Sequence, residues 1–240
     1  MKRKALRVLV SGAAGRMGRA VTAEMASSPA FELAGRVDSA GGEGIELPAA
    51  FAGLLSSADV AVDFSSPAAA CAYAAACAGA RKPFVTGTTG FSGAQLASLK
   101  AAARRTAVFF SPNMSPAVNL CFSLAAFAAG RLHGFDVHVH EAHHSAKKDA
   151  PSGTALRFAA AIAAARGGKP PPMTSVRAGD IVGDHTVLFA GPHERVELKH
   201  MAHSRAVFAA GALKAAVWTA ARRPGFYDYF DLLGIRKLVK

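Results

Sequence analysis

Two adjacent histidines, two adjacent lysines and an aspartate stand in one short segment, EAHHSAKKDAPSGTA, between Glu141 and Ala155. Imidazole groups titrate near neutral pH, and lysine ammonium groups bind anions and donate protons. The Pro-Ser-Gly-Thr sequence leads into an Ala-rich stretch and is typical of a helix start, where backbone N–H groups attract negative charge. The segment therefore predicts an active site that handles protons on an anionic molecule.

The cations of this segment fit a substrate with two carboxylates. Lys147, Lys148 and the predicted helix N-terminus at residues 152–154 would supply positive charge together. Pro151 suits the helix start, because its missing N–H costs nothing there. Lys148 and burial would both lower the pKa of Lys147 toward neutrality, which suits a proton donor. Arg205, in HSRAVF, is a candidate for a further carboxylate contact, and an ion pair at the surface or core edge is the alternative.

Metal binding is the alternative function of this segment, because His138, His140, His143 and His144 cluster in the sequence. His138 and His140 would share one face of a strand. No HExxH or Cys–His spacing accompanies them, and the lysines that follow would repel a divalent cation. We therefore expect no metal and interpret His138 and His140 as solvated polar residues of a strand.

A second candidate site, SGAAGRMGRA, follows the first predicted strand. Its glycines, Gly12, Gly15 and Gly18, are spaced GxxGxxG, which differs from the common GxGxxG. A strand lies before the loop and a helix after it, as phosphate binding requires, and Arg16 adds a cation. The pattern predicts a dinucleotide-binding loop, and a tight turn that only packs the helix against the strand is the alternative.

Asp38 ends the second predicted strand, about twenty residues past the loop, where Rossmann-type units place an acid on the ribose hydroxyls. Its carboxylate would repel a 2′-phosphate, which favours NADH over NADPH. Arg36 and Arg19 are the alternatives in favour of NADPH, since either could bind that phosphate.

Two further loops, GTTG and SPNM, follow the fourth and fifth predicted strands. Ligands of parallel sheets bind outside the carboxyl ends of the strands, so both loops should face the cofactor. The candidate cofactor-binding residues are Gly12, Ala13, Ala14, Gly15, Arg16, Met17, Asp38, Gly87, Thr88, Thr89, Ser111, Pro112, Asn113 and Met114.

Alternating strand and helix patterns in the first half of the chain must position these loops. Strands are predicted at residues 5–10, 31–38, 58–65, 82–90 and 106–113, with helical patterns between them. This alternation predicts a parallel sheet with helices on both faces. We therefore predict an α/β fold in which residues 1–114 form a Rossmann-type dinucleotide-binding domain.

The pattern changes in the second predicted domain, residues 115–205. A helix over 116–132 precedes FDVHVHEAHH, whose alternation suits a strand with one exposed face, and another helix is predicted over 152–166. SVRAGDIVGDHTVLFAG and HERVELKHMA then indicate further strands. These elements predict a smaller α+β domain with a mixed or antiparallel sheet that binds the substrate. The closing segment, 206–240, begins as a helix and is expected to pack back onto the first domain.

The composition limits the classes of function. The 240 residues include 28 Lys and Arg against 16 Asp and Glu, a formal charge of +12, which could indicate nucleic-acid binding. The basic residues are scattered, however, so we expect a basic surface that favours anionic small molecules and no nucleic-acid partner. The apolar runs are too short for a membrane helix, so we expect no membrane partner. The basic start lacks a signal-peptide pattern, and the three cysteines include no CxxC pair. We therefore expect a cytoplasmic location.

Seven sequence blocks together resemble one family. In chain order they are GxxGRMG, DFSSP, GTTGF, SPNMS, EAHHSAKKDAPSGTA, VRAGDIVGDHTVLF and GFYDYFDLLG, over nearly the whole chain. They resemble the 4-hydroxy-tetrahydrodipicolinate reductase (dihydrodipicolinate reductase) family of the bacterial and plant lysine pathway, to which the E-x-HHxxKxDAPSGTA segment is highly specific. The resemblance implies NADH- or NADPH-dependent reduction of a cyclic hydroxylated imine dicarboxylate to tetrahydrodipicolinate, with loss of water, in the diaminopimelate route of lysine biosynthesis.

The resemblance also implies roles for individual residues. His143 would be the proton donor and acceptor and Lys147 the proton donor, and the second domain would also mediate assembly into a homotetramer. An acid is required because negative charge develops beside a conjugated imine once it receives a hydride. From the resemblance and the charges described above, the candidate substrate-binding residues are His144, Lys148, Ser152, Gly153, Thr154 and Arg205.

Two stretches depart from the family pattern. Only nine residues, GGKPPPMTS, follow the predicted helix over 152–166, where family members often carry a longer loop, and the stretch after Asp38 is also compact. These differences concern local packing and subunit contacts and leave every candidate site residue in place. Ser39 does not supply the basic residue that members using both cofactors can place there, which again favours NADH.

Two other functions are compatible with the sequence. A different nicotinamide dehydrogenase with this fold would act on another small dicarboxylate or an amino acid. A dinucleotide sensor or a nucleic-acid binder would bind without turnover, and Lys147→Ala would not change its behaviour. The intact HHxxK arrangement favours an enzyme.

Overall fold

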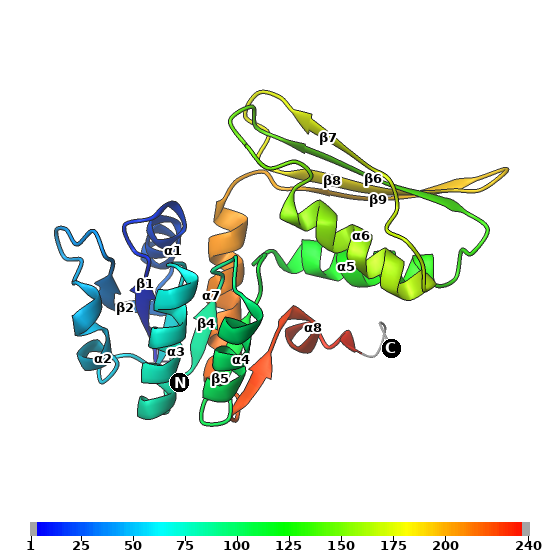
Figure 1. The fold of residues 1–240 in the computed structure, drawn as a ribbon. Coiled ribbons are helices and arrows are strands. Elements are labelled where there is room, and N and C mark those ends of the chain that lie inside the picture. Colours follow the sequence, from blue (N-terminus) through cyan, green and yellow to red (C-terminus); the bar gives the residue numbers. More distant parts are fainter. Residues whose placement is uncertain (1–3, 237–240) are drawn as a thin grey trace. The chain divides into compact units, whose positions relative to one another are not determined.

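The computed structural model describes residues 4–236, which form two compact units (Figure 1). Within the described residues, the first unit contains 4–114 together with Ala206–Leu232, and the second contains Ser115–Arg205 together with 233–236. The ends of the two predicted terminal segments, residues 1–3 and 237–240, lie outside the described part. No helix within residues 4–236 has the length and apolar character needed to cross a membrane.

The first unit is built on a six-stranded sheet in which every neighbouring pair is parallel. Its strands are β1 (Leu6–Ser11), β2 (Phe31–Val37), β3 (Val60–Asp63), β4 (Phe84–Thr86), β5 (Ala107–Phe110) and β10 (Gly225–Tyr227), in the order β10-β5-β4-β3-β1-β2. The central strands are apolar and buried, as strands covered on both faces must be. The predicted Rossmann-type sheet is confirmed, and β10 adds a sixth strand that was not predicted.

Helices cover both faces of this sheet. They are α1 (Arg16–Ala26), α2 (Phe51–Leu54), α3 (Pro67–Ala80), α4 (Gly93–Ala102), α7 (Ala206–Ala220) and α8 (Tyr229–Leu232), with a short 3-10 helix, η1, at Pro48–Ala50. α1 packs with α7 on one face, and α3 packs with α4 on the other. A Cβ on Gly211 of α7 would stand 1.7 Å from the carbonyl oxygen of Met114, so only glycine permits this approach.

The carboxyl end of β3 holds a fully buried carboxylate, Asp63. Its Oδ1 accepts hydrogen bonds from the hydroxyls of Ser11 (2.8 Å) and Ser65 (2.5 Å), and its Oδ2 accepts from Thr86 (2.7 Å) and Thr88 (2.8 Å). Burial raises the pKa of Asp63, and these hydrogen bonds oppose the shift. One side chain thus ties together the ends of β1, β3 and β4, from which two of the predicted cofactor loops begin.

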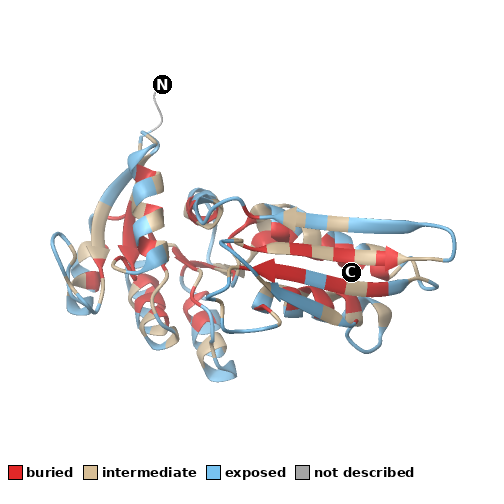
Figure 2. Ribbon diagram, turned by 90° about the horizontal axis from the view of Figure 1, so that it is seen from above, coloured by how far each residue is buried: buried red, intermediate tan, exposed pale blue. Residues whose placement is uncertain are grey.

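The second unit contains a four-stranded mixed sheet. Its strands are β6 (Asp136–His143), β7 (Met173–Arg177), β8 (Asp184–Ala190) and β9 (Arg195–Met201), in the order β7-β6-β8-β9, with β6 and β7 parallel and the other pairs antiparallel. Helices α5 (Pro116–Ala129) and α6 (Gly153–Arg166) cover one face, and the edge strands are largely exposed (Figure 2). The predicted mixed-sheet domain is confirmed, although α5 ends before its predicted boundary because Gly130 follows as the C-cap.

Candidate active site

Strand β6 directs alternate side chains to opposite faces of its sheet. Glu141 is completely buried and His143 is 9% exposed, so both point toward the helix-covered face. His138 and His140 lie on the opposite face, where their rings contact the hydroxyl of Thr174 at 3.0 and 2.9 Å. The histidines considered together for a metal site are therefore separated, and His143 belongs to the interior.

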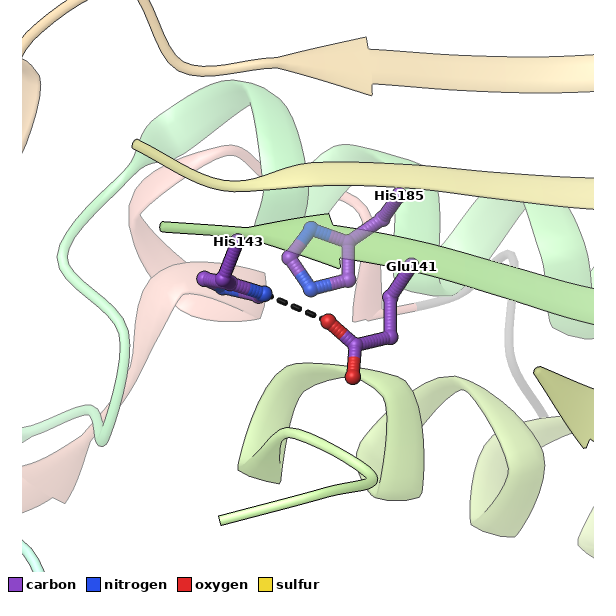
Figure 3. Close-up of side chains that lie close together, drawn as sticks. All are labelled: Glu141, His143 and His185. Carbon is purple, nitrogen blue, oxygen red and sulfur yellow. Dashed lines mark hydrogen bonds and ion pairs between the residues drawn. The ribbon is translucent and has the colours of Figure 1, made fainter. Parts of the chain in front are cut away.

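Several hydrogen bonds hold the Glu141 carboxylate in this interior. Its Oε2 accepts from Nδ1 of His143 (2.5 Å) and from Arg177 (3.0 Å), and its Oε1 accepts from Arg177 (2.8 Å) and the backbone N–H of Ser152 (3.2 Å). The His185 ring stands beside the His143 ring (Figure 3). Ligand-type atoms of Glu141, His143 and His185 lie within 4.8 Å of one another. Because the roughly four lone-pair positions of a carboxylate are already used, we interpret the cluster as a hydrogen-bond network.

The ionisation states of the cluster follow from burial and charge. Burial opposes ionisation of Glu141, but hydrogen bonds led by those from Arg177 outweigh it and lower the pKa of Glu141 to about 2. Burial lowers the pKa of His143, and the neighbouring carboxylate opposes that shift. Burial also lowers the pKa of His185 to about 3. An ionised carboxylate only accepts hydrogen bonds, so Nδ1 of His143 donates, and Nε2 carries the lone pair of the neutral ring.

The second ring nitrogen of His143 is available to a ligand. Within residues 4–236, Nδ1 makes the hydrogen bond of this ring and Nε2 makes none. A Cβ at Gly183 would stand 3.0 Å from Nε2, so the glycine keeps the space beside this atom open. Nε2 is therefore the atom of His143 that can exchange a proton with a bound molecule.

Glu141→Gln is expected to destabilise the protein strongly at neutral pH and less at acid pH. The pKa of Glu141 is lowered to about 2 in the folded state from 4.5, so its contribution is fully present above pH 4.5 and is lost as the pH falls toward 2. We expect a melting temperature roughly 5 °C or more lower at pH 7, because breaking a buried ion pair costs about 3 kcal/mol. Thermal unfolding followed by circular dichroism at several pH values measures the difference in melting temperature between the wild type and the variant. This difference should become smaller below pH 4.5. A difference that stays constant down to pH 3 contradicts the assignment.

The loop between β6 and α6 carries the two lysines. The Lys147 ammonium contacts the Asp149 carboxylate at 2.8 Å, which lowers the pKa of Asp149, and Lys148 is exposed. Arg177 donates a hydrogen bond to the backbone oxygen of Asp149 (2.5 Å). One guanidinium thus holds both the Glu141 carboxylate and the loop of Lys147.

Helix α6 begins at Gly153, with Ser152 as its N-cap. The predicted start is displaced by one residue, and Pro151 therefore precedes the cap instead of occupying the first helical position. The Ser152 hydroxyl caps the helix and contacts Nε2 of His185 at 3.1 Å, and its backbone N–H donates to the buried carboxylate described above. Ser152 therefore serves the interior, whereas Gly153 and Thr154 form the more accessible first turn.

A pocket of about 300 Å³ in the second unit brings together two candidate substrate residues that are far apart in the sequence. His144 and Arg205 both line it, and Ser145, Ala146, Asp180 and Val182 complete the lining. Lys147, Lys148, Gly153 and Thr154 are not among its lining residues. The Arg205 guanidinium and the ionisable His144 ring suit an anionic ligand, and the Asp180 carboxylate offsets part of the positive charge.

The loop after β1 is shaped by its glycines. Gly12 has a φ of 72°, and a Cβ there would stand 2.3 Å from the carbonyl oxygen of Phe64. A Cβ on Gly18 would stand 2.2 Å from the carbonyl oxygen of Gly12, so this glycine allows α1 to approach the loop. Gly15 is the N-cap of α1, and Arg16 is exposed at its first position. The loop therefore makes a tight turn, and none of the described side chains caps the start of α1. The binding of a dinucleotide by this loop stays a prediction.

A pocket of about 690 Å³ lies against this loop in the first unit. Gly12, Gly15 and Asp38 contribute to its lining, as do Phe51 and Tyr73, whose rings stack with centroids 4.1 Å apart. Glycine backbone, a carboxylate and aromatic walls are the groups that a dinucleotide requires for its phosphates, ribose and base. The residues present therefore fit a nicotinamide dinucleotide.

Asp38 and Arg36 at the end of β2 have different surroundings. The Asp38 carboxylate accepts hydrogen bonds from the backbone N–H groups of Ala14 (3.0 Å) and Ala40 (2.9 Å) and lies at the pocket. The Arg36 guanidinium donates to the backbone oxygens of Glu43 and Gly44, both at 3.0 Å. Arg36 therefore holds the following loop, and the acid is the charged group that β2 presents to the pocket.

The remaining predicted cofactor residues lie in the loops after β4 and β5. A Cβ on Gly87 would stand 2.2 Å from the ring of Phe64, which lines the large pocket. The hydroxyl of Thr88 is turned inward to Asp63, as described above, and that of Ser111 donates to the backbone oxygen of Asn113 (2.7 Å). Ala13, Thr88, Ser111 and Met114 are buried, whereas Arg16, Thr89 and Pro112 are exposed, and Ala14, Met17, Gly87 and Asn113 are partly exposed.

Three residues of the candidate site were not predicted: Glu141, Arg177 and His185. Strand alternation in Glu-Ala-His was a usable signal, because it places Glu141 on the same face as His143. Arg177 and His185 reach the site through strand pairing, in which Arg177 lies opposite His143 and His185 opposite Glu141. The local sequence around these two residues carries no sign of that register.

Comparisons with known proteins identify relatives over nearly the full length. Residues 6–114 match the family model described as dihydrodipicolinate reductase, N-terminus, and residues 117–233 match dihydrodipicolinate reductase, C-terminus. Proteins from Thiobacillus denitrificans and Laribacter hongkongensis, both named 4-hydroxy-tetrahydrodipicolinate reductase, are 43% and 41% identical; each alignment covers 96% of this chain and 99% of the relative.

Solved structures share the fold. A dipicolinate-bound dihydrodipicolinate reductase from Paenisporosarcina sp. TG-14 aligns with a TM-score of 0.78 and 22% identity, over 95% of this chain and 98% of that one. A DAP dehydrogenase from C. glutamicum, in complex with DAP, aligns with a TM-score of 0.60 and 13% identity, over 99% and 96% of the two chains.

Proposed function

The chain belongs to the dihydrodipicolinate reductase family, and we propose that it reduces 4-hydroxy-tetrahydrodipicolinate to tetrahydrodipicolinate with loss of water, as an oxidoreductase that uses a nicotinamide dinucleotide. The observation that carries this proposal is the match of both halves of the family to adjacent segments that cover almost the whole chain. The reaction belongs to the diaminopimelate route of lysine biosynthesis.

The residues of the second unit are proposed to bind the substrate and to move its protons. The nicotinamide supplies a hydride when it is bound, and charge balance then requires one proton at the neighbouring position of the reduced imine. His143 is proposed as the proton donor and acceptor through Nε2, and Lys147 as a proton donor that also offsets negative charge. The proposed substrate-binding residues are His144, Lys148, Gly153, Thr154 and Arg205, and Ser152 contributes by capping α6.

The residues of the first unit are proposed to bind the dinucleotide. The loop from Gly12 to Met17 would hold the pyrophosphate against the start of α1, and Asp38 would accept hydrogen bonds from the ribose hydroxyls. The loops 87–89 and 111–114 would complete the nicotinamide end. No metal ion is needed for the proton and hydride transfers proposed here.

We propose that NADH is the preferred cofactor. The support is the Asp38 carboxylate at the pocket, together with the engagement of Arg36 by the backbone oxygens of the following loop. A carboxylate there would repel the 2′-phosphate of NADPH, and Arg36 would have to leave its present partners to offset it.

Asp38→Asn is expected to reduce the preference for NADH by about tenfold, because it removes a like-charge repulsion of about 1.4 kcal/mol. The measurement is kcat/KM for NADH and for NADPH, followed by absorbance, with the substrate generated in place from pyruvate and aspartate semialdehyde by its synthase. Glu32→Gln, an exposed carboxylate change at the other end of the same strand, is the control and should leave the ratio unchanged. A ratio that stays the same in Asp38→Asn contradicts the assignment.

The same assay tests the function itself. Nicotinamide oxidation should depend on the complete synthase mixture and should disappear when either synthase substrate is omitted. If the wild-type protein binds NADH but oxidises it no faster in the complete mixture, the proposed reaction is wrong.

We propose a homotetramer assembled through the sheet of the second unit. Within the described part of that unit, helices cover only one face of the sheet, and the opposite face exposes apolar side chains such as Val176 and Met201. A sheet face that no helix covers and that exposes apolar side chains supports association between copies through that face. The molecular mass in solution, measured by light scattering, tests this, and a monomer at assay concentration would contradict it.

A further inference from the structure

The buried network beside His143 contains groups that have no role in the chemistry proposed above. The charged and titratable groups around the His143 ring are Glu141 on its own strand, Arg177 on β7, His185 on β8 and Lys147 in the following loop. Two of them, Glu141 and Arg177, form an ion pair in an interior where a charged pair is costly to bury. Their arrangement therefore calls for a specific explanation.

Arg177 fixes the orientation of the Glu141 carboxylate. Its two terminal nitrogens each contact one carboxylate oxygen, at 3.0 and 2.8 Å, a geometry that sets the plane of the carboxylate. The Ser152 N–H adds a third contact from the start of α6. With these donors in place, Oε2 of Glu141 faces Nδ1 of His143 at 2.5 Å.

The consequence for His143 is a fixed ring and a fixed tautomer. Nδ1 must donate to the ionised carboxylate, and this contact holds the ring so that Nε2 lies beside Gly183, where no side chain of that residue covers it. When Nε2 takes a proton, the carboxylate on the other side of the ring stabilises the resulting imidazolium.

We propose that Glu141, held by Arg177, is a positioning residue for His143: it keeps one proton on Nδ1 and leaves Nε2 as the atom that exchanges protons with the substrate. This inference rests on the proposed function for the role of His143 in turnover, but the tautomer itself does not depend on that role. Arg177 also contacts the backbone of Asp149, so the same guanidinium helps to position the loop of Lys147.

The tautomer can be tested on the wild-type protein. Two-bond ¹H–¹⁵N spectra of the histidine rings distinguish a neutral ring protonated at Nδ1 from one protonated at Nε2, and the His143 signal is the one that is lost in His143→Gln. We expect the Nδ1-protonated form in the wild type. A wild-type ring protonated at Nε2 overturns the proposal, whether or not the protein is active.

Glu141→Gln tests the positioning role. We expect kcat to fall at least about tenfold with little change in KM, as for other residues that orient a reacting histidine. The spectra should show a mixture of tautomers, and the pKa of His143 should move to lower pH because the stabilising charge is lost. Glu194→Gln, the same change at an exposed residue of the second unit, is the matched control and should behave like the wild type.

A double variant separates positioning from a merely structural effect. If Glu141 acts through His143, adding Glu141→Gln to His143→Gln should change kcat by less than about twofold. Multiplicative losses overturn the proposal. If Glu141→Gln does not fold, Arg177→Lys is the substitute variant, because lysine keeps the positive charge but cannot contact both carboxylate oxygens as arginine does. Arg177→Lys should also lower kcat. An unchanged kcat in this variant overturns the proposal. Failure of the wild type to oxidise NADH would instead refute the function and leave the tautomer test in force.

Discussion

His143→Gln is expected to lower kcat by about 100-fold or more, the usual contribution of a positioned acid–base group. Glutamine has no group that titrates near neutral pH, so it cannot exchange the proton that Nε2 exchanges. Its amide can still donate to Glu141 from nearly the same place, so the buried network should survive. The measurement is NADH oxidation with substrate generated in place, together with thermal unfolding of the same preparation.

The control for this variant is His133→Gln, which makes the same change at an exposed residue before β6. It should retain wild-type kcat. If His143→Gln retains more than about a tenth of wild-type kcat while remaining folded, His143 is not an acid–base group of the reaction.

Lys147→Met should also reduce turnover, by about 100-fold in kcat, and should raise KM. Methionine keeps most of the unbranched stem of the side chain but removes the ammonium that is proposed to protonate the substrate and to offset its charge. The contact with Asp149 is partly exposed, with 22% and 61% of the two side chains accessible, so its loss should change stability by less than about 1 kcal/mol.

Lys169→Met, in the exposed loop after α6, is the matched control for the loss of one positive charge. It should leave kcat and KM unchanged and thereby separate a local effect of Lys147 from a change in net charge. Equal effects of the two variants would show that Lys147 acts only through the general field of the protein.

The sequence predicted the strands that carry a continuous apolar signal. β1, β3 and β5 are short runs of Val, Ala, Leu or Phe between loops, and such runs are informative because they are buried on both faces. β10 was missed because Gly225–Tyr227 is short and its residues are only partly buried, so it lacks the continuous apolar signal of the central strands. Its identity as a strand comes from pairing with β5, which no local pattern records.

The candidate site was predictable where its residues are neighbours in the chain. His143 and Lys147 stand in one segment, and their side-chain chemistry alone indicates proton transfer. Glu141 stands in the same segment, but its role depends on Arg177, which arrives 36 positions later in the chain. For Ser152 the local sequence is not sufficient. Its residue type suits an anion site, but in the fold its N–H and hydroxyl are directed inward, to Glu141 and His185.

The path of the chain through the first unit has a consequence for biosynthesis. Helix α7 packs against α1, β3, β4 and β5, and β10 completes the sheet beside β5, yet both follow the second unit in the sequence. On the ribosome, the first 114 residues therefore emerge without α7, which shares the cover of one face of their sheet with α1, and without the edge strand β10. The second unit, which is continuous from Ser115 to Arg205, can complete most of its contacts earlier. The order of maturation would then run against the common order in which the N-terminal domain folds first, and the sheet of the first unit would be finished last.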